Sequence, residues 1–150
     1  MDARFLARSI QLAQENVELG GHPFGSVITK GDVVIAEGAN LVEELKDPTA
    51  HAEVVAIRRA CQDLGAPELT GLTIYASAEP CPMCLAAIHW SRLSRVVFAA
   101  TRHVASAAGF DDAHLYREIP LPPERRSIPT LHLPHPEELE PFDRWRARST

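Results

Sequence analysis

Two segments, His51-Ala52-Glu53 and Pro80-Cys81-Pro82-Met83-Cys84, constrain the fold most strongly, because their ligating side chains are expected to meet at one point. One histidine and two cysteines are ligands that zinc prefers. A structural zinc is normally closed by four protein ligands, whereas a hydrolytic zinc keeps its fourth position for a water molecule. The sequence therefore predicts a catalytic Zn²⁺ site, in which Glu53 is the proton carrier rather than a ligand. The predicted metal ligands are His51, Cys81 and Cys84.

The cysteine pair is expected to begin a helix. Cys81 and Cys84 are three residues apart, which places both side chains on one helical face, and the flanking prolines suit the first turn of a helix better than its interior. Residues 72–77 are rich in β-forming and apolar residues and predict a buried strand just before the pair. Ligands that follow the C-terminal end of a strand are typical of an α/β site.

The histidine is expected in the first turn of a second helix, because residues 52–60 are rich in alanine and have helical apolar periodicity. Two residues on a regular helix point about 200° apart. His51 and Glu53 can therefore converge on one pocket only near a helix start that faces the pocket. The spacing alone leaves open whether they do.

Two other interpretations of the cysteines remain. A Cys-x-x-Cys pair beside an α/β pattern is also typical of a thiol-disulfide site, although such a site has no use for the His-Ala-Glu segment. A structural zinc would need a fourth ligand, for which the candidates are Cys61, His89 and His103.

Length and composition favour a single cytoplasmic domain. The 150 residues can form a core without disulfides, and the three cysteines suit a reducing compartment. The N-terminus lacks the apolar core of a signal peptide, and no apolar run is long enough to span a bilayer, so we expect no membrane partner. The net charge of −5 disfavours nucleic acid as a partner.

Strands and helices alternate along the chain. Residues 2–19 predict a helix, and residues 24–29 and 33–37 predict an antiparallel hairpin around Lys30-Gly31-Asp32. Residues 95–100 predict another buried strand, so helices should cover both faces of a sheet. Three further elements are expected towards the C-terminus: a helix through residues 114–117, a last strand at 127–133 and a helix at 136–148.

The chain resembles the cytidine deaminase-like superfamily of zinc enzymes, and within it the bacterial guanine deaminases, along nearly its whole length. The resemblance rests on Pro23-Phe24-Gly25, Asn40, residues 47–53, residues 79–84 and Ala108-Gly109-Phe110-Asp111-Asp112, the last of which selects the subgroup. It implies a three-layer α/β/α sandwich with a five-stranded mixed sheet. It also implies a homodimer of one domain, residues 1–150, whose C-terminal segments are exchanged between subunits.

The resemblance also implies the reaction: hydrolytic deamination of a nucleobase, giving xanthine and ammonia from guanine and water. The residues implied to contact the substrate are Phe24, Asn40, Ala52, Trp90 and Asp112. Phe24 offers a stacking face, Asn40 can donate and accept, and an ionised Asp112 suits the N–H edge of guanine. Asp111 or Asp112 could instead cap the helix that follows.

One departure from the subgroup concerns the tail. Guanine deaminases usually continue past the Trp145 region to a terminal aromatic residue, whereas this sequence ends at Arg148-Ser149-Thr150. The alternative substrates are therefore cytosine, a nucleoside such as guanosine, and a triazine. Among related enzymes a tRNA adenosine deaminase is the nearest alternative, although the acidic charge does not favour it.

Overall fold

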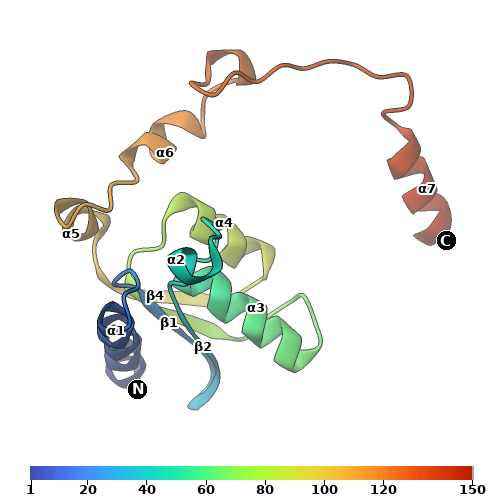
Figure 1. Cartoon of the computed structure of the whole chain (residues 1–150). Coiled ribbons are helices and arrows are strands. Elements are labelled where there is room, and N and C mark those ends of the chain that lie inside the picture. Colours follow the sequence, from blue (N-terminus) through green and yellow to red (C-terminus); the bar gives the residue numbers. More distant parts are fainter. Residues whose placement is uncertain (150) are drawn as a thin grey trace. The chain divides into compact units, whose positions relative to one another are not determined.

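The computed structural model describes residues 1–149 and divides the chain into two compact units (Figure 1). The first unit comprises Met1–Ala113, and the second begins at His114. The predicted site residues all lie in the first unit. None of the helices in residues 1–149 is both long and apolar enough to cross a membrane.

A mixed sheet lies at the centre of the first unit. Its strands are β1 (Gly25–Lys30), β2 (Val33–Ala39), β3 (Thr73–Ala78) and β4 (Arg95–Ala100), in the order β2-β1-β3-β4. β1 is antiparallel to both of its neighbours, and β3 is parallel to β4. The predicted hairpin is confirmed, and Gly31 has the positive φ of 60° that such a tight turn favours. β3 ends at Ala78, only three residues before Cys81, so its carboxyl end leads directly to the cysteine pair.

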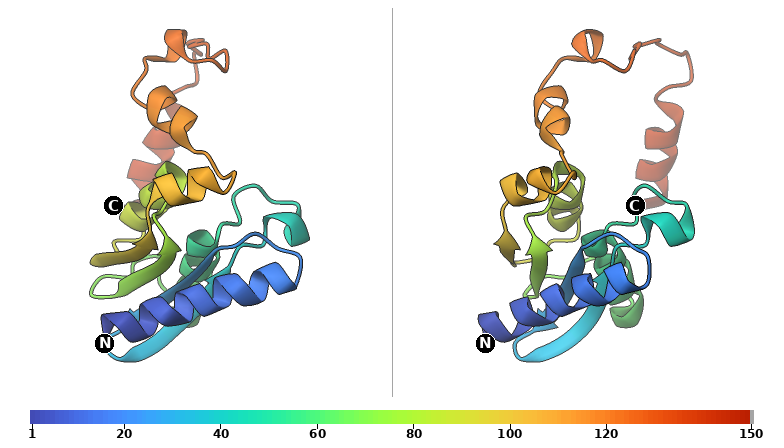
Figure 2. Two further views of the ribbon diagram at one scale, coloured as in Figure 1. Left: turned by 90° about the vertical axis from the view of Figure 1, so that its left-hand side faces the viewer. Right: turned by 60° about the vertical axis from the view of Figure 1, so that its left-hand side comes forward.

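Helices cover both faces of this sheet (Figures 1 and 2). α1 (Asp2–Glu18) packs on one face, where Phe5 contacts Val27 and Tyr75. α3 (Ala52–Leu64) and α4 (Pro82–Trp90) pack on the opposite face around Ile28 and Ile74. Because successive strand residues point to opposite faces, Val27 and Ile28 serve the two different cores. The predicted α/β/α arrangement is confirmed.

Two short helices were not predicted. α2 (Val42–Leu45) follows β2, and α5 (Arg102–Ala107) follows β4. The side chain of Thr101 accepts a hydrogen bond from the Val104 N–H at the start of α5. That capping threonine is the sequence signal from which α5 could have been found.

The expectation of a five-stranded sheet is wrong for residues 1–149, because the sheet has four strands. The expected last strand at residues 127–133 is irregular chain. Pro129 and Pro134 have no N–H for a ladder, and the Ser127 N–H donates to the Glu118 carboxylate at 3.1 Å. Leu131 is 85% exposed, so the alternating apolar residues do not mark a buried face.

The second unit carries α6 (Ala113–Glu118), which begins at the boundary, a 3₁₀ turn (Pro123–Arg125) and α7 (Glu140–Ser149). The expected helix at 136–148 thus begins later than its sequence suggests. Local hydrogen bonds hold residues 136–139 in turns, because Glu138 accepts from the His135 N–H at 2.9 Å and His135 Nδ1 accepts from the Glu137 N–H at 3.1 Å.

Candidate metal centre and active site

His51 stands at the N-cap of α3 and lies outside its regular turns. Its φ and ψ of −63° and 155° are extended, so its side chain does not follow the helical wheel. The preceding turn is fixed by Asp47, whose carboxylate accepts from the Thr49 N–H at 2.9 Å, and by the His51 N–H, which donates to the Thr49 carbonyl at 2.8 Å. This geometry allows His51 and the buried Glu53 to serve one site, a point that the spacing alone left open.

Cys81 occupies the corresponding N-cap position of α4. Its backbone is extended, with a φ of −66° and a ψ of 168°, and Pro82 begins the helix. Cys84 lies in the first turn and is buried, and the Cys81 carbonyl accepts from the Leu85 N–H at 2.8 Å. The predicted order of strand, loop, cysteine pair and helix is confirmed.

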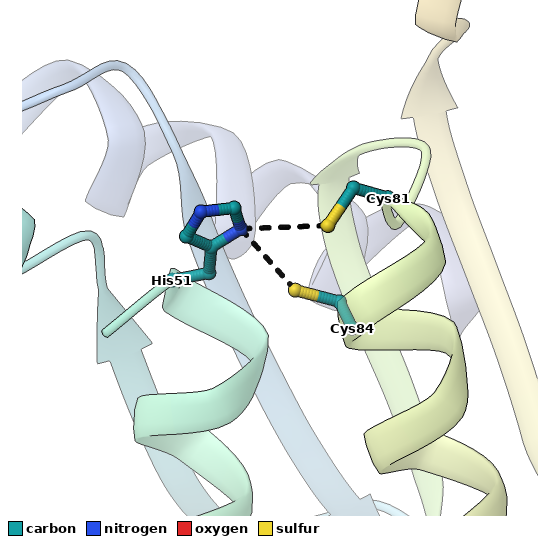
Figure 3. Close-up of side chains that lie close together, drawn as sticks. All are labelled: His51, Cys81 and Cys84. Atoms are coloured by element: carbon teal, nitrogen blue, oxygen red, sulfur yellow. Dashed lines mark hydrogen bonds between the residues drawn. The ribbon is translucent and has the colours of Figure 1, made fainter. Parts of the chain in front are cut away.

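The three predicted ligands converge (Figure 3). His51 Nδ1 lies 3.6 Å from Cys81 Sγ and 3.4 Å from Cys84 Sγ. Ligand bonds of about 2.0–2.1 Å to nitrogen and 2.3 Å to sulfur give a nitrogen-to-sulfur edge of about 3.6 Å in a tetrahedral zinc site. The donor set and its spacing therefore fit zinc.

Among the described residues, no fourth protein side chain belongs to the ligand set. Within residues 1–149, His51, Cys81 and Cys84 form the only group of three or more potential ligands whose atoms lie within 4.8 Å of one another. Cys61, His89 and His103 are not members of it, and Cys61, a residue of α3, instead packs against the hydrophobic core. This arrangement leaves a position for substrate or water, as a catalytic zinc requires.

The electrostatics of the cluster favour a thiolate at Cys81. Hydrogen bonding from Cys84, assisted by His51, lowers the pKa of Cys81 to about 4. The same contact with Cys81, together with burial, raises the pKa of Cys84. Contact with Cys81 also raises the pKa of His51. Binding of zinc would require both thiolates and a neutral imidazole, so it would release protons.

Glu53 is 7% exposed, and burial raises the pKa of its carboxyl group. Its hydrogen bond with Cys84 acts in the opposite direction. Glu53 therefore lies against the ligand set without belonging to it. A buried carboxylate with a raised pKa can accept a proton and return it, which suits a general base that later acts as an acid.

Two of the predicted substrate residues, Phe24 and Asn40, are tied together and to the metal site. The Asn40 N–H donates to the Phe24 carbonyl at 3.1 Å, and the next N–H, of Leu41, donates to the Ala50 carbonyl at 2.9 Å. Asn40 Oδ1 accepts from the Val42 N–H at 3.1 Å, and among residues 1–149 its amide nitrogen has no hydrogen-bond partner. Asn40 can therefore donate to a ligand.

Ala52 and Trp90 have opposite environments. Ala52 is fully buried in the first turn of α3, beside His51. Trp90 ends α4 and is 80% exposed, whereas the cysteines lie at the other end of that helix. The structure of residues 1–149 does not bring Trp90 to the cluster, and a substrate contact by Trp90 stays a prediction.

The two aspartates just before α6 differ in the hydrogen bonding of their carboxylates. Asp111 Oδ1 accepts from the Ala113 N–H at 2.9 Å, which is the capping role that the sequence left open. Asp112 is half-buried, and within residues 1–149 its carboxylate has no hydrogen bond or ion pair. Asp112 therefore keeps its acceptor capacity for another group.

Phe110 is a contact that sequence reasoning missed. Its ring packs edge-on against Phe24, with centroids 5.0 Å apart and planes at 89°, and lies 5.5 Å from the His22 ring. Both phenylalanines line an apolar cavity of about 400 Å³ between α1 and α5, and the three metal ligands do not line it. Phe110 thus fixes the orientation of the Phe24 ring.

The site geometry and the family comparison agree. Residues 1–100 match the model of the cytidine and deoxycytidylate deaminase zinc-binding region, and the chain belongs to this family of zinc-dependent deaminases. It is an aminohydrolase that uses zinc as its cofactor.

Within this family of deaminases, individual relatives differ in how much of the chain they match. The chain is 52% identical to a guanine deaminase of Bacillus subtilis (strain 168) over 143 residues, covering 95% of this chain and 92% of that protein. The X-ray structure of guanine deaminase from Bacillus subtilis superposes with a TM-score of 0.95 at 51% identity, covering 97% and 93% of the two chains. A tRNA-specific adenosine deaminase of Aquifex aeolicus (strain VF5) is 44% identical over 96 residues, 64% of each chain.

Proposed function

We propose that the protein deaminates guanine by hydrolysis, giving xanthine and ammonia. The observation that carries this proposal is the similarity to a guanine deaminase, which extends over 95% of the chain. The similarity to the tRNA deaminase covers 64% of the chain. In the proposed reaction water forms a C–O bond at the amino-bearing carbon, and the C–N bond to the amine breaks.

His51, Cys81 and Cys84 would hold the metal, and Glu53 would carry the protons. A bound zinc ion supplies a Lewis acid that activates water near neutral pH. Glu53 takes one proton from the attacking water, holds it on its buried carboxyl group and delivers it to the ring nitrogen. It then takes the second proton from the new C–O–H group and delivers it to the amine, which leaves as ammonia while the C=O bond forms. Its burial beside Cys84 supports this role, because the raised pKa makes proton uptake favourable.

Five residues would contact the base: Phe24, Asn40, Ala52, Trp90 and Asp112. Phe24 stacks on the ring, and the Asn40 amide nitrogen donates to a ring acceptor. Asp112 accepts from the N–H edge of guanine. Within the described part of the chain, residues 1–149, the Asn40 amide nitrogen and the Asp112 carboxylate have no hydrogen-bond partner, which supports these assignments.

An ammonia-release panel tests the substrate. Guanine should be the fastest substrate among guanine, guanosine, cytosine, cytidine, adenine and small triazines. Faster turnover of cytosine or a nucleoside would reject guanine while leaving the zinc deaminase class intact. A gel-shift with tRNA at physiological salt separates the tRNA alternative, because the net charge of −5 predicts no tight, salt-sensitive binding.

Metal analysis of the purified protein should find about one zinc per chain, from the three-ligand set. Cys61→Ser should keep this zinc, because Cys61 lies outside the ligand group. Loss of zinc on that change would support the structural interpretation.

We also propose that the enzyme is cytoplasmic, because its three cysteines form no disulfide and free thiols suit a reducing compartment.

We further propose a homodimer of one domain, residues 1–150, with exchanged C-terminal segments. Large apolar side chains of the second unit are solvent-exposed in the isolated chain, which supports a partner surface. They include Ile128 at 78%, Leu131 at 85%, Leu133 at 79%, Phe142 at 61% and Trp145 at 59%. Truncation after Pro141 should reduce deaminase activity. The mass of the truncated protein in solution should be measured in parallel, to show whether it still forms a dimer. Unchanged activity would exclude a covering role for the tail.

A further inference from the structure

Asn16 is a buried polar residue on the apolar face of α1. The buried residues of this helix are Phe5, Ser9, Ala13 and Asn16, which follow the helical repeat towards the sheet. Asn16 is 6% exposed. Burying a side-chain amide is unfavourable unless its hydrogen bonds are made, and an aliphatic residue would pack here without that requirement. The Asn16 amide is therefore expected to make hydrogen bonds within the protein.

Both hydrogens of the Asn16 amide are used. Asn16 Nδ2 donates to the His22 carbonyl at 2.7 Å and to the Asn40 carbonyl at 2.9 Å. These acceptors belong to two separate loops, one between α1 and β1 and the other after β2. Asn16 is thus the side chain that joins the two loops through a single nitrogen.

The two loops carry the residues proposed to hold the base. The His22 carbonyl also accepts from the Phe24 N–H at 2.9 Å, and the Phe24 carbonyl accepts from the Asn40 N–H at 3.1 Å. A continuous set of hydrogen bonds therefore leads from Asn16 to Phe24 and Asn40, and through Leu41 to Ala50, which precedes His51.

Gly21 closes over the amide. A Cβ atom at residue 21 would stand 2.5 Å from Asn16 Nδ2, and the Gly21 N–H donates to the Asn16 main-chain carbonyl at 2.8 Å. The atoms in the way are the end of the Asn16 side chain, so a methyl group there would move the amide without deleting it. The loop is therefore built around the Asn16 side chain.

We infer that Asn16 is a positioning residue for the substrate, whose amide sets Phe24 and Asn40 against the metal site. Asn16 touches neither the metal ligands nor, in this proposal, the base; it acts through the two loops. The inference rests on the proposed function for the identity of the substrate, but the loop geometry does not depend on that identity.

The experiment uses zinc-loaded Asn16→Asp, Gly21→Ala and the control Gln11→Glu. Asn16→Asp keeps the size but has no amide hydrogens, and its charge would face two carbonyl oxygens. Gln11→Glu makes the same change of amide to carboxylate at an exposed position of the same helix. We expect kcat/KM for guanine to fall about tenfold or more in the first two variants, mainly through KM, with zinc content unchanged. The control should match the wild type.

Hydrogen exchange separates positioning from simple loss of stability. The Phe24, Asn40 and Val42 amides should exchange faster in Asn16→Asp, while the β3 amides keep wild-type protection. Unchanged exchange at these amides, or a loss of kcat/KM with unchanged KM and proportional to the unfolded fraction, would overturn the inference. If the wild type fails to deaminate guanine but the local exchange effect is seen, the proposed substrate is rejected and the role of Asn16 in holding the loops stands.

Discussion

Gly38 of β2 lies so close to Ala52 of α3 that a Cβ atom on Gly38 would stand 2.4 Å from the Ala52 carbonyl oxygen. The main chain of Ala56 is similarly close, with its nitrogen at 2.7 Å from that position. Both neighbours are backbone atoms of a helix, which cannot rotate away. The absence of a side chain at Gly38 therefore lets the first turn of α3, and with it His51, lie against the sheet.

Gly38→Ala should push the start of α3 outward. Overpacking of this kind costs about 1–3 kcal/mol of unfolding free energy, and displacement of His51 should speed zinc loss to a chelator. Gly31→Ala is the matched control, because Gly31 has a φ of 60° and no neighbour from residues 1–149 lies within 4 Å of an added Cβ. It should lose comparable stability, about 1–2 kcal/mol, while keeping zinc. Equal zinc retention in both variants would contradict the positioning of His51 by Gly38.

Glu53→Gln should keep the fold and the zinc but lose nearly all turnover. The change preserves shape and removes the carboxylate proposed to exchange protons. General acid–base groups contribute roughly 10²–10⁴-fold, and a residue acting at several proton steps should lie at or above the top of that range. Steady-state ammonia release with metal analysis is the measurement. A variant retaining a tenth of the wild-type rate would show that Glu53 is not the proton carrier.

Two comparisons make that result specific. Asp63→Asn makes the same change of carboxylate to amide on an exposed part of α3 and should leave turnover unaltered. His51→Ala should also abolish activity, but by releasing zinc, which the metal analysis distinguishes from the loss of a proton carrier.

The metal site was predictable from residue types, but its convergence was not. His51 and Glu53 would diverge by about 200° on a regular helix. They meet because His51 occupies an extended N-cap, with a ψ of 155°, and only Glu53 follows the helix. Backbone conformation at a cap depends on the turn before it, here fixed by Asp47 and Thr49, and a spacing rule does not contain that information.

The central strands and helices were predictable because their apolar residues recur with the period of the element and point into a core, as Ile28 and Ile74 do. The expected strand at 127–133 failed because nothing in its alternation reports whether a neighbouring strand is present. Asn16 was missed for a related reason: a polar residue on a helix is normally solvated, and only tertiary structure reveals that two carbonyls surround it.

The ion pair between Arg8 and Glu37 should contribute to the pH dependence of stability. Arg8 Nε and Nη2 contact the two Glu37 oxygens at 2.8 and 2.7 Å, joining α1 to β2. This pairing lowers the pKa of Glu37. A carboxyl group with a lowered folded-state pKa stabilises the fold above its unfolded pKa, about 4.3, and loses that contribution as the pH falls through the folded value.

Glu37→Gln should therefore lower the unfolding free energy at pH 7, and this effect should diminish as the pH falls from 7 towards 3. Because both side chains are about one-third exposed, at 34% and 32%, solvent screening limits the difference to about 0.5–1 kcal/mol. Urea unfolding of both proteins across this range measures it. Glu18→Gln, at an exposed position of α1, is the control and should show no such trend. A difference that persists undiminished at pH 3 would contradict the ionic origin.

The adjacent aspartates Asp111 and Asp112 offer a test of substrate recognition, because among the described residues 1–149 only the carboxylate of Asp111 has a hydrogen-bond partner. Asp111 holds the Ala113 N–H at 2.9 Å, and an asparagine can make the same bond through its carbonyl oxygen. Asp112 has no hydrogen-bond partner within residues 1–149. A carboxylate at this position can accept from the N–H edge of guanine, an edge that adenine lacks.

Asp112→Asn should lower kcat/KM for guanine by roughly ten- to a hundredfold, corresponding to about 1–3 kcal/mol for a mispaired polar group in the pocket. The amide keeps the size of the side chain but replaces an anion by a neutral group, part of which donates. Asp111→Asn should keep wild-type kinetics, because its local capping bond survives. A pyrimidine that never reaches Asp112 should be turned over equally by both variants. If Asp112→Asn leaves guanine turnover unchanged, Asp112 does not bind the base, and the proposal of guanine as substrate loses the residue that would recognise it. The proposed zinc chemistry at His51, Cys81 and Cys84 does not depend on this result.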